Sequence, residues 1–307
     1  MPAVAAAAPA ATDQADTDVA ADAGLPDVRS GSAAVLDVAT GVTIFAKDAD
    51  EVRAIASTTK IFVAMAVRKA GIDLDGWTEI TRDDAHAAHG GARTRLDVGQ
   101  TFQNVDLLRA MLMASDNRAP TALARAAGLD DDGLIAAMNG IAADLGLERT
   151  TFTDTSGLRG NVSTAREMAL ALRAALEDPV LAEIMRTDRV RIVSKSKYAK
   201  LDYANTSQPL LAGKRAITGG KTGYTRAAGY CFVSGVEIDG RAYVTAFLGA
   251  DGKLTRFADF ERVAAWLDDG APGAAVKVTT TASTGSTKAA LKVRAKPTGT
   301  VKAKKRK

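Results

Sequence analysis

The sequence predicts an α+β fold in which an antiparallel sheet is built from both ends of the chain and is flanked by helices. Strand patterns occur near the N-terminal end and again from residue 216, and the residues between them show helical periodicity. This order places a helical block as an insertion between the two parts of the sheet. We expect the folded domain at 30–270, between a flexible Ala-rich leader at 1–29 and a disordered basic tail at 271–307.

The first elements expected are a β-hairpin and a half-buried helix. Residues 34–38 and 42–45 are rich in apolar and β-branched side chains and flank a turn at 39–41, a pattern typical of a hairpin. From residue 57 to 70 apolar side chains recur at helical spacing, and Gly71 ends the pattern. These elements open the domain.

Helices are expected through the middle of the chain and strands after it. The helical segments share apolar faces and cover residues 105–114, 118–127, 132–145 and 164–176. The last of them opens with a capping box formed by Thr164 and Glu167. Strand patterns then cover residues 217–224, 229–236 and 242–248, with a tight turn at 238–241. An amphipathic helix is expected over 254–267, where it would pack against the sheet.

Composition excludes several classes of protein. The chain is 47% apolar and 25% charged, which excludes a disordered or collagen-like protein, and no apolar run is long enough to span a membrane. Residues 271–307 hold ten Lys or Arg and no acidic residue, and subtracting this +10 from the total of +4 leaves −6 on the remainder. Because the body is mildly acidic, we expect no nucleic-acid partner.

Neither a disulfide nor a metal site is expected. Cys231 is the single cysteine and falls in a predicted strand, where it is interpreted as a small core residue. The two histidines, His86 and His89, lie in a polar stretch that runs into two glycines. We interpret this stretch as a solvated loop rather than a zinc site.

Three short motifs follow one another along the chain. An S-x-x-K motif runs from Ser57 to Lys60 at the start of a predicted helix, and an S-D-N motif begins at Ser115 between two helices. A K-T-G motif begins at Lys221 in a predicted strand. Each motif alone is weak, but this set in this order is typical of penicillin-binding proteins and class A β-lactamases.

The first and third motifs carry the chemistry of an activated nucleophile. A serine hydroxyl needs a base beside it, and residues three apart on a helix share a face, so Lys60 can reach Ser57. A lysine accepts a proton only when neutral, a form favoured by burial and by a second cation such as Lys221. The backbone N–H groups of Ser57 and Tyr224 are candidates for an oxyanion hole, and Gly223 permits close approach of a substrate backbone.

Beyond these motifs, the chain resembles the serine-type D-alanyl-D-alanine peptidases, the low-molecular-mass penicillin-binding proteins. The resemblance covers residues 30–270 and includes the segments 152–158, 163–169 and 220–230. It implies a β-lactamase/transpeptidase-like fold. It also implies that Ser57 is the acyl-ester nucleophile and that Lys60 is its proton acceptor.

The same resemblance assigns the remaining residues. It implies that Ser115 relays a proton toward the leaving amine and that Asn117 holds the substrate amide. Lys221 and Thr222 would bind the substrate's terminal carboxylate or the equivalent group of a penicillin. Arg256 would add a further carboxylate contact, and a salt bridge on the helix surface is the alternative for this residue. No cofactor is implied.

The implied partners are peptidoglycan stem peptides as substrates and β-lactams as inhibitors. Residues 92–96 and 252–256 resemble the DD-endopeptidase branch, which lacks the second β-rich domain and the anchor helix of the carboxypeptidases, so both reactions stay open. We expect an exported enzyme, periplasmic or associated with the cell wall, although the leader is not typical of a signal peptide. The basic tail is a candidate for binding anionic wall polymers or lipid headgroups.

Two alternatives remain. A class A β-lactamase would require Glu-x-x-Leu-Asn between the second and third motifs, and the nearest match begins at Glu167 but lacks the Asn. A non-catalytic wall-binding relative would keep the fold without the reaction. The missing Asn favours the peptidase over the β-lactamase, and the three intact motifs favour it over the non-catalytic relative.

Overall fold

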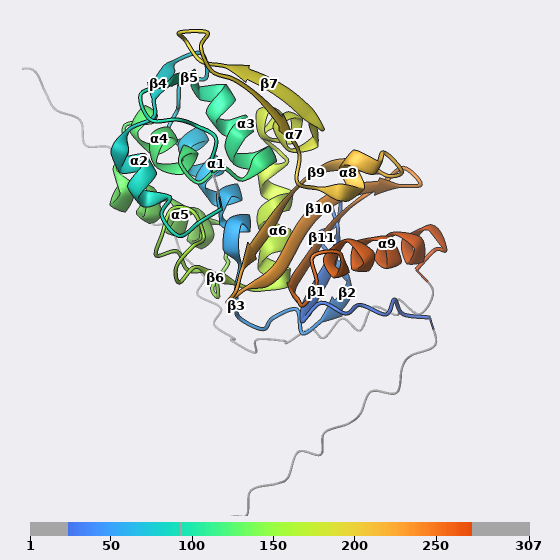
Figure 1. Cartoon of the computed structure of the whole chain (residues 1–307). Coiled ribbons are helices and arrows are strands. Elements are labelled where there is room, and N and C mark those ends of the chain that lie inside the picture. The colour runs from blue at the N-terminus through green and yellow to red at the C-terminus, as the bar shows by residue number, and fades with distance from the viewer. Residues whose placement is uncertain (1–23, 93, 272–307) are drawn as a thin grey trace, which may run out of the picture. The chain divides into compact units, whose positions relative to one another are not determined.

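The computed structural model describes residues 24–92 and 94–271, and it confirms the predicted α+β fold. A five-stranded antiparallel sheet has the order β2-β1-β11-β10-β9 (Figure 1). Its strands come from the two ends of this part of the chain: β1 (Ser32–Asp37), β2 (Thr43–Lys47), β9 (Ala216–Thr225), β10 (Gly229–Ile238) and β11 (Arg241–Ala250). The pairing of β1 with β11 joins the N-terminal and C-terminal strands, as predicted.

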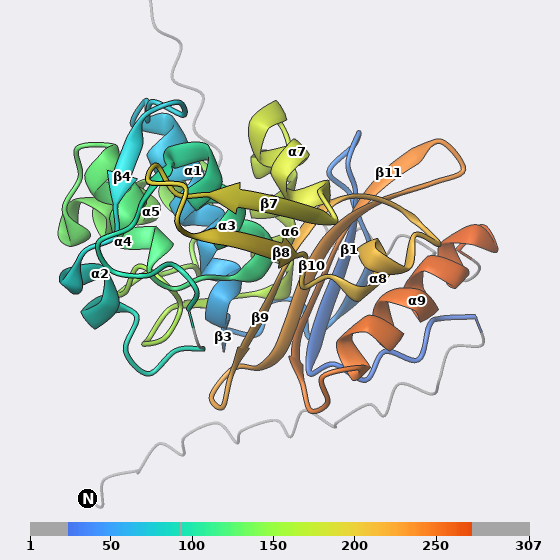
Figure 2. The same cartoon turned by 45° about the horizontal axis from the view of Figure 1, so that its top comes forward.

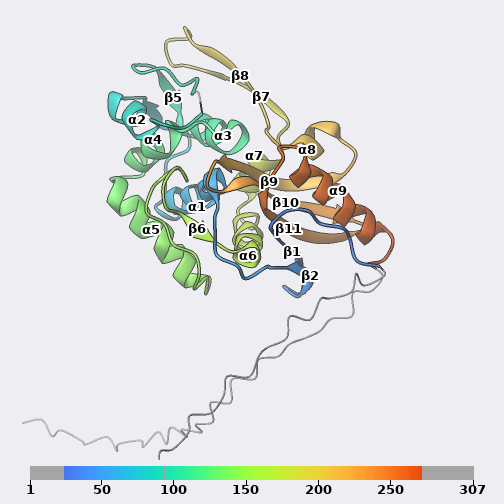
Figure 3. The same ribbon diagram turned by 60° about the horizontal axis from the view of Figure 1, so that its bottom comes forward.

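Both faces of the sheet are buried. Successive side chains of a strand point to opposite faces, so Val35 packs with α9 (Thr255–Asp268) and Leu36 packs with α6 (Ala165–Ala175). Figure 3 shows these two helices on opposite sides of the sheet. All six residues of β1 are buried as a result, and the sheet gives a rigid support to its edge strand β9.

The inserted helical block lies between β2 and β9 in sequence. Its remaining helices are α1 (Lys60–Lys69), α2 (Arg82–Ala87), α3 (Asn104–Ala114), α4 (Ala119–Ala126), α5 (Asp131–Asp144), α7 (Pro179–Arg186) and α8 (Gln208–Ala212). Three short strand pairs accompany them: β3 (Arg53–Ala54) with β6 (Val162–Ser163), β4 (Trp77–Glu79) with β5 (Thr101–Gln103), and β7 (Arg189–Val193) with β8 (Lys200–Ala204). Figure 2 shows the β7–β8 hairpin extending from α8 toward β4.

Two local predictions differ from the structure. The helix expected from residue 57 begins as a 3-10 turn, η1 (Ala56–Thr59), and continues as α1. The interpretation of the histidine stretch as a loop was wrong for His86, which lies in α2 because Thr81 and Asp84 form a capping box at its start. The side chains of both histidines are exposed, as expected for a solvated stretch.

The predicted capping box at α6 forms only in part. Thr164 accepts a hydrogen bond from the backbone N–H of Glu167, as predicted. The Glu167 carboxylate instead accepts from the N–H of Arg149 and from the hydroxyl of Thr150. Glu167 therefore ties α6 to the segment before β6 rather than to its own helix start.

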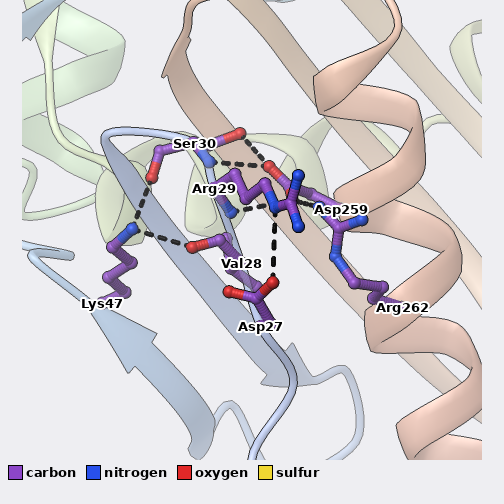
Figure 4. A network of polar contacts seen from close by, with 7 residues as sticks. All are labelled: Asp27, Val28, Arg29, Ser30, Lys47, Asp259 and Arg262. Atoms are coloured by element: carbon purple, nitrogen blue, oxygen red, sulfur yellow. Dashed lines mark hydrogen bonds and ion pairs between the residues drawn. The ribbon is translucent and has the colours of Figure 1, made fainter.

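The domain begins before the expected boundary at residue 30. Val28 is buried, and Asp259 of α9 accepts from the backbone N–H groups of Arg29 (2.8 Å) and Ser30 (2.7 Å). Lys47 donates to the carbonyls of Val28 and Ser30, and Figure 4 shows this network. The segment just before β1, assigned above to the leader, is part of the fold.

The rest of the leader (1–23) and the tail (272–307) lie outside the described residues. Among the described helices, none combines the length and the apolar character needed to cross a bilayer. Cys231 is buried in β10, which confirms its interpretation as a core residue. Burial raises the pKa of its thiol to about 11, so it is unsuited to act as a nucleophile.

Candidate active site

Ser57 and Lys60 face each other, as the S-x-x-K spacing predicts. Ser57 lies in η1 and Lys60 is the first residue of α1, and Lys60 Nζ donates to Ser57 Oγ at 2.9 Å. The turn is tight, because Ala56 has φ = 48°, a region that few residues other than glycine adopt. Lys60 is fully buried while Ser57 is partly exposed. The Ser57 hydroxyl is thus accessible from outside the protein, and the amine beside it is not.

Lys60 also joins the first motif to the second. Its Nζ donates to Oδ1 of Asn117 at 2.6 Å and to the carbonyl of Ser156 at 2.9 Å. Burial lowers the pKa of Lys60 to about 7, against the opposing charges of Asp154 and Asp116. Near neutral pH a large fraction of this lysine is therefore uncharged and able to accept a proton.

A loop that the sequence did not assign to the site holds the Ser156 carbonyl against Lys60. Asp154 Oδ1 accepts from the N–H groups of Ser156 (2.9 Å) and Gly157 (2.5 Å). A Cβ on Gly157 would lie 1.9 Å from the carbonyl oxygen of Ala56, so only glycine fits against the η1 turn. The signal in the sequence was the resemblance of residues 152–158 to the peptidases, which carried no role.

The three residues of the S-D-N motif make different contacts. Ser115 has φ = 63° and ends α3, and its hydroxyl makes no hydrogen bond to any described residue. Asp116 accepts from the backbone N–H groups of Arg95 (2.9 Å) and Arg118 (3.0 Å), which fixes the loops on either side. Asn117 alone of the three reaches Lys60. Asp116 is therefore structural, and the hydroxyl of Ser115 has its hydrogen-bonding capacity free.

The K-T-G motif lies on the edge strand β9, directly against the η1 turn that carries Ser57. A Cβ on Gly223 would lie 3.1 Å from the backbone nitrogen of Ser57 and 2.9 Å from the carbonyl oxygen of Ile55. Glycine is therefore needed for the strand to approach the turn this closely. The contact brings together the segments that carry the Ser57 and Tyr224 N–H groups, the candidate oxyanion hole.

Lys221 is a second buried lysine at the site. Its side chain is almost fully buried, and Nζ donates to the carbonyl of Thr222 at 2.8 Å. Burial lowers the pKa of Lys221 well below its ordinary value, and the positive charges of Lys60 and Arg256 lower it further. Burial and the neighbouring cations therefore both act against the charged form of Lys221 while no ligand is bound.

Comparison with known proteins agrees with this geometry. The profile of the peptidase S11 family, described as D-alanyl-D-alanine carboxypeptidase, matches residues 17–252. The chain belongs to this family. A D-alanyl-D-alanine endopeptidase of Escherichia coli is 32% identical over 257 residues, which is 83% of each chain. One of Pseudomonas aeruginosa is 33% identical over 252 residues, 81% of each chain.

A likeness to solved structures confirms the predicted transpeptidase-like fold of this S11 peptidase. The crystal structure of the Streptomyces K15 DD-transpeptidase superimposes with a TM-score of 0.72 at 25% identity. The match covers 78% of this chain and 97% of the other. A putative penicillin-binding protein homolog of Mycobacterium tuberculosis has a TM-score of 0.69 at 27% identity, covering 78% of this chain and 93% of the other.

Thr206 is a further residue of the peptidase site that the sequence did not single out. The hydroxyl of Thr222 donates to Thr206 Oγ1 at 2.6 Å, and the backbone N–H of Thr206 donates to the carbonyl of Met113 at 3.0 Å. Thr206 thus connects the third motif to the end of α3, next to the second. It lies between β8 and α8 in a segment without periodicity, so no pattern marked it.

Arg256 is buried within the peptidase domain rather than placed on the surface of α9. Its Nη1 donates to the carbonyls of Gly223 at 2.7 Å and Cys231 at 2.9 Å. The guanidinium lies over the rings of Tyr230 and Phe257, 5.2 Å and 4.7 Å from their centroids. No described carboxylate pairs with it, so the alternative of a helix-surface salt bridge was wrong. Burial lowers its pKa to about 10.

Proposed function

We propose that this S11 peptidase is a serine DD-peptidase that forms an acyl-enzyme on D-Ala-D-Ala bonds or D-Ala cross-links of peptidoglycan. The observation that carries the proposal is the contact of Ser57 Oγ with the buried Nζ of Lys60 at 2.9 Å. The lowered pKa of Lys60 gives that amine the protonation state of a general base. Family membership and the names of the relatives support the choice of substrate.

We propose the following reaction for these groups. Ser57 Oγ attacks the carbonyl carbon of D-Ala while Lys60 takes its proton, and the carbonyl electron pair moves onto the oxygen. The N–H groups of Ser57 and Tyr224 stabilise this oxyanion. Collapse of the intermediate breaks the C–N bond, and Ser115 relays the proton to the leaving amine. Water then hydrolyses the acyl ester and regenerates Ser57.

The sheet edge would hold the substrate. Among the described residues, Lys221 Nζ has one hydrogen-bond acceptor, the Thr222 carbonyl, so its other protons are free for an anion. Lys221 and Thr222 are proposed to bind the terminal carboxylate, and Asn117 the substrate amide. A bound carboxylate would raise the pKa of Lys221 and so favour its charged form.

The β-lactamase alternative is disfavoured by the position of Glu167. Activation of a deacylating water needs a carboxylate near the acyl ester, but both oxygens of Glu167 accept hydrogen bonds, from Arg149 and Thr150. Slow acylation by nitrocefin would agree with the peptidase, and rapid turnover would instead establish a β-lactamase.

Covalent labelling tests the nucleophile. We expect the mass of the intact protein to increase by one benzylpenicillin, and we expect the Ser57→Ala variant to show no increase. Lys69→Ala, on the exposed end of α1, is the matched control and should label normally. A parent protein that never labels would indicate the non-catalytic wall-binding relative.

Cross-link cleavage is the second candidate reaction, favoured by the two relatives named as endopeptidases. We propose that the chain cleaves D-Ala cross-links as well as or in place of the terminal D-Ala bond. Incubation with purified dimeric and monomeric muropeptides separates the two reactions. Conversion of dimers to monomers supports endopeptidase action, and release of D-Ala alone excludes it.

The place of action and the tail are proposals of their own. We propose that the enzyme acts outside the cytoplasmic membrane, in the periplasm or at the wall, where its substrate lies. The ten cations of 271–307 are proposed to bind anionic wall polymers or lipid headgroups, at about 1 kcal/mol or less per contact. Deletion of these residues should weaken wall association at low salt, and unchanged association would exclude this role.

A further inference from the structure

The buried guanidinium of Arg256 contacts the peptide group that carries one of the two candidate oxyanion donors. Arg256 Nη1 donates to the carbonyl oxygen of Gly223 at 2.7 Å. That carbonyl belongs to the same peptide group as the N–H of Tyr224. The arginine therefore acts on the oxyanion hole from the side opposite to the nucleophile.

We propose that Arg256 is a positioning residue that orients and polarises the Tyr224 N–H of the oxyanion hole. This inference rests on the proposed acyl-enzyme function. It gives the buried Nη1 of Arg256 a task in acylation that does not depend on a carboxylate of the substrate.

The geometry of the peptide group supports this role. In a planar trans peptide the C=O and N–H bonds point in opposite directions. A donor fixed on the Gly223 oxygen therefore directs the Tyr224 N–H away from Arg256. The Cβ position of Gly223 lies 3.1 Å from the Ser57 nitrogen, so this part of β9 is already in contact with the nucleophile turn.

The charge of Arg256 strengthens the effect. A hydrogen bond from a cation draws electron density toward the carbonyl oxygen and makes the N–H of the same peptide group a stronger donor. Burial keeps water from screening this field, because only 5% of the Arg256 surface is exposed. The contact with the Cys231 carbonyl (2.9 Å) and the packing over Tyr230 hold the guanidinium in one position.

The two roles predict different kinetics. A ligand of the carboxylate contributes only to compounds that carry one, whereas an oxyanion-hole residue contributes to every acylation. The test compares the acylation rate constants of benzylpenicillin and benzylpenicillin methyl ester in the full chain and in Arg256→Gln. We expect the rate constant of the methyl ester to fall as well as that of benzylpenicillin, by about tenfold, which is less than the roughly 100- to 1,000-fold loss of an oxyanion donor itself.

Two further variants serve as controls. Arg256→Lys keeps the charge but not the paired contacts, so its loss should be smaller than that of Arg256→Gln. Arg262→Gln lies on the same helix and removes a contact to Asp259 instead, so it should leave both rate constants unchanged.

The infrared frequency of the acyl-ester carbonyl gives a readout that misfolding does not mimic, because only acylated molecules contribute. Weaker oxyanion donors should move this stretch to higher wavenumber in Arg256→Gln. A loss confined to benzylpenicillin, or an unchanged frequency, would overturn the proposal. Failure of the parent protein to acylate at all would instead reject the proposed function.

Discussion

The site of Ser57 has a helical side, formed by Lys60, Asn117 and Ser156, and a sheet side, formed by residues 221–223 of β9. On the helical side the Lys60 ammonium meets three protein acceptors within 2.9 Å. On the sheet side Lys221 meets one among the described residues. Lys60 therefore has a protein acceptor for each of its three N–H bonds, while Lys221 has N–H bonds without a partner among the described residues.

Both lysines are buried, so burial alone does not explain their different tasks. When Lys60 is neutral, its two N–H groups can keep the contacts with Asn117 and Ser156, and its lone pair is left facing Ser57 Oγ. Lys221, with fewer acceptors in the protein, gains most when an anion arrives. The two buried lysines thus differ in their hydrogen-bond partners rather than in residue type.

The largest effect is expected where the two sides touch. In Gly223→Ala, the added Cβ would lie 2.9 Å from the Ile55 carbonyl, so β9 must move away from the Ser57 turn. A displacement of this kind misplaces the oxyanion hole, and we expect acylation by benzylpenicillin to fall at least about 100-fold. Gly140→Ala, with open space around its Cβ position, is the control and should acylate normally. Normal acylation by Gly223→Ala would show that acylation does not need the close approach of β9 to the Ser57 turn.

On the helical side, the pH dependence of acylation reports on Lys60. Only the neutral amine accepts the Ser57 proton, so the rate should rise with pH through about 7, the pKa of Lys60. The Asp154 carboxylate raises that pKa. Asp154→Asn should therefore move the rise to lower pH. Since about one tenth of Lys60 is neutral at pH 6, the gain there is at most about tenfold.

Stopped-flow acylation between pH 5 and 9 measures this shift. Asp50→Asn removes a carboxylate that pairs with Arg166 at the surface, and it should leave the profile unchanged. A rise that moves to higher pH in Asp154→Asn would contradict the assigned role of Lys60.

On the sheet side, we expect a smaller effect from Thr206→Val. This variant removes the oxygen that accepts the Thr222 hydroxyl at 2.6 Å, so Thr222 is less well oriented toward a carboxylate. A neutral hydrogen bond contributes about 0.5–1.5 kcal/mol, which corresponds to a rise in KM of about 2- to 13-fold with kcat little changed. Thr206→Ser keeps the oxygen and should restore KM. A fall in kcat alone would place Thr206 with the proton path instead.

The smallest effect on catalysis is expected outside both sides. Asp259→Ala leaves the backbone N–H groups of Arg29 and Ser30 without their acceptor (Figure 4). We expect the free energy of unfolding to fall by about 2 kcal/mol, measured by urea denaturation, with an unchanged acylation rate. Asp27→Ala removes an exposed ion pair of Arg29 and should change stability little. Equal losses of stability in Asp259→Ala and Asp27→Ala would argue against a stabilising role of the Asp259 hydrogen bonds.

Local spacing along the chain was enough to predict the contact of Ser57 with Lys60. Ser57 and Lys60 are one helical turn apart, so their contact follows from the start of a helix wherever that helix packs. The strands of the sheet and the longer helices were likewise predicted from their periodicity. Short elements such as α7, α8 and β3–β8 were missed because few residues share their pattern.

The contacts between distant parts of the chain could not be predicted in this way, because they depend on how the helices and the sheet pack. The Ser156 carbonyl reaches Lys60 across 96 positions, and Arg256 reaches Gly223 across 33. Every residue has a backbone carbonyl, so the sequence does not show which carbonyl contacts Lys60. An arginine in a helix can form a surface salt bridge or a buried hydrogen bond, and the sequence does not distinguish the two. Burial, which sets the pKa of Lys60 and of Lys221, is likewise a property of the packed domain, because it depends on residues that surround each amine from distant parts of the chain.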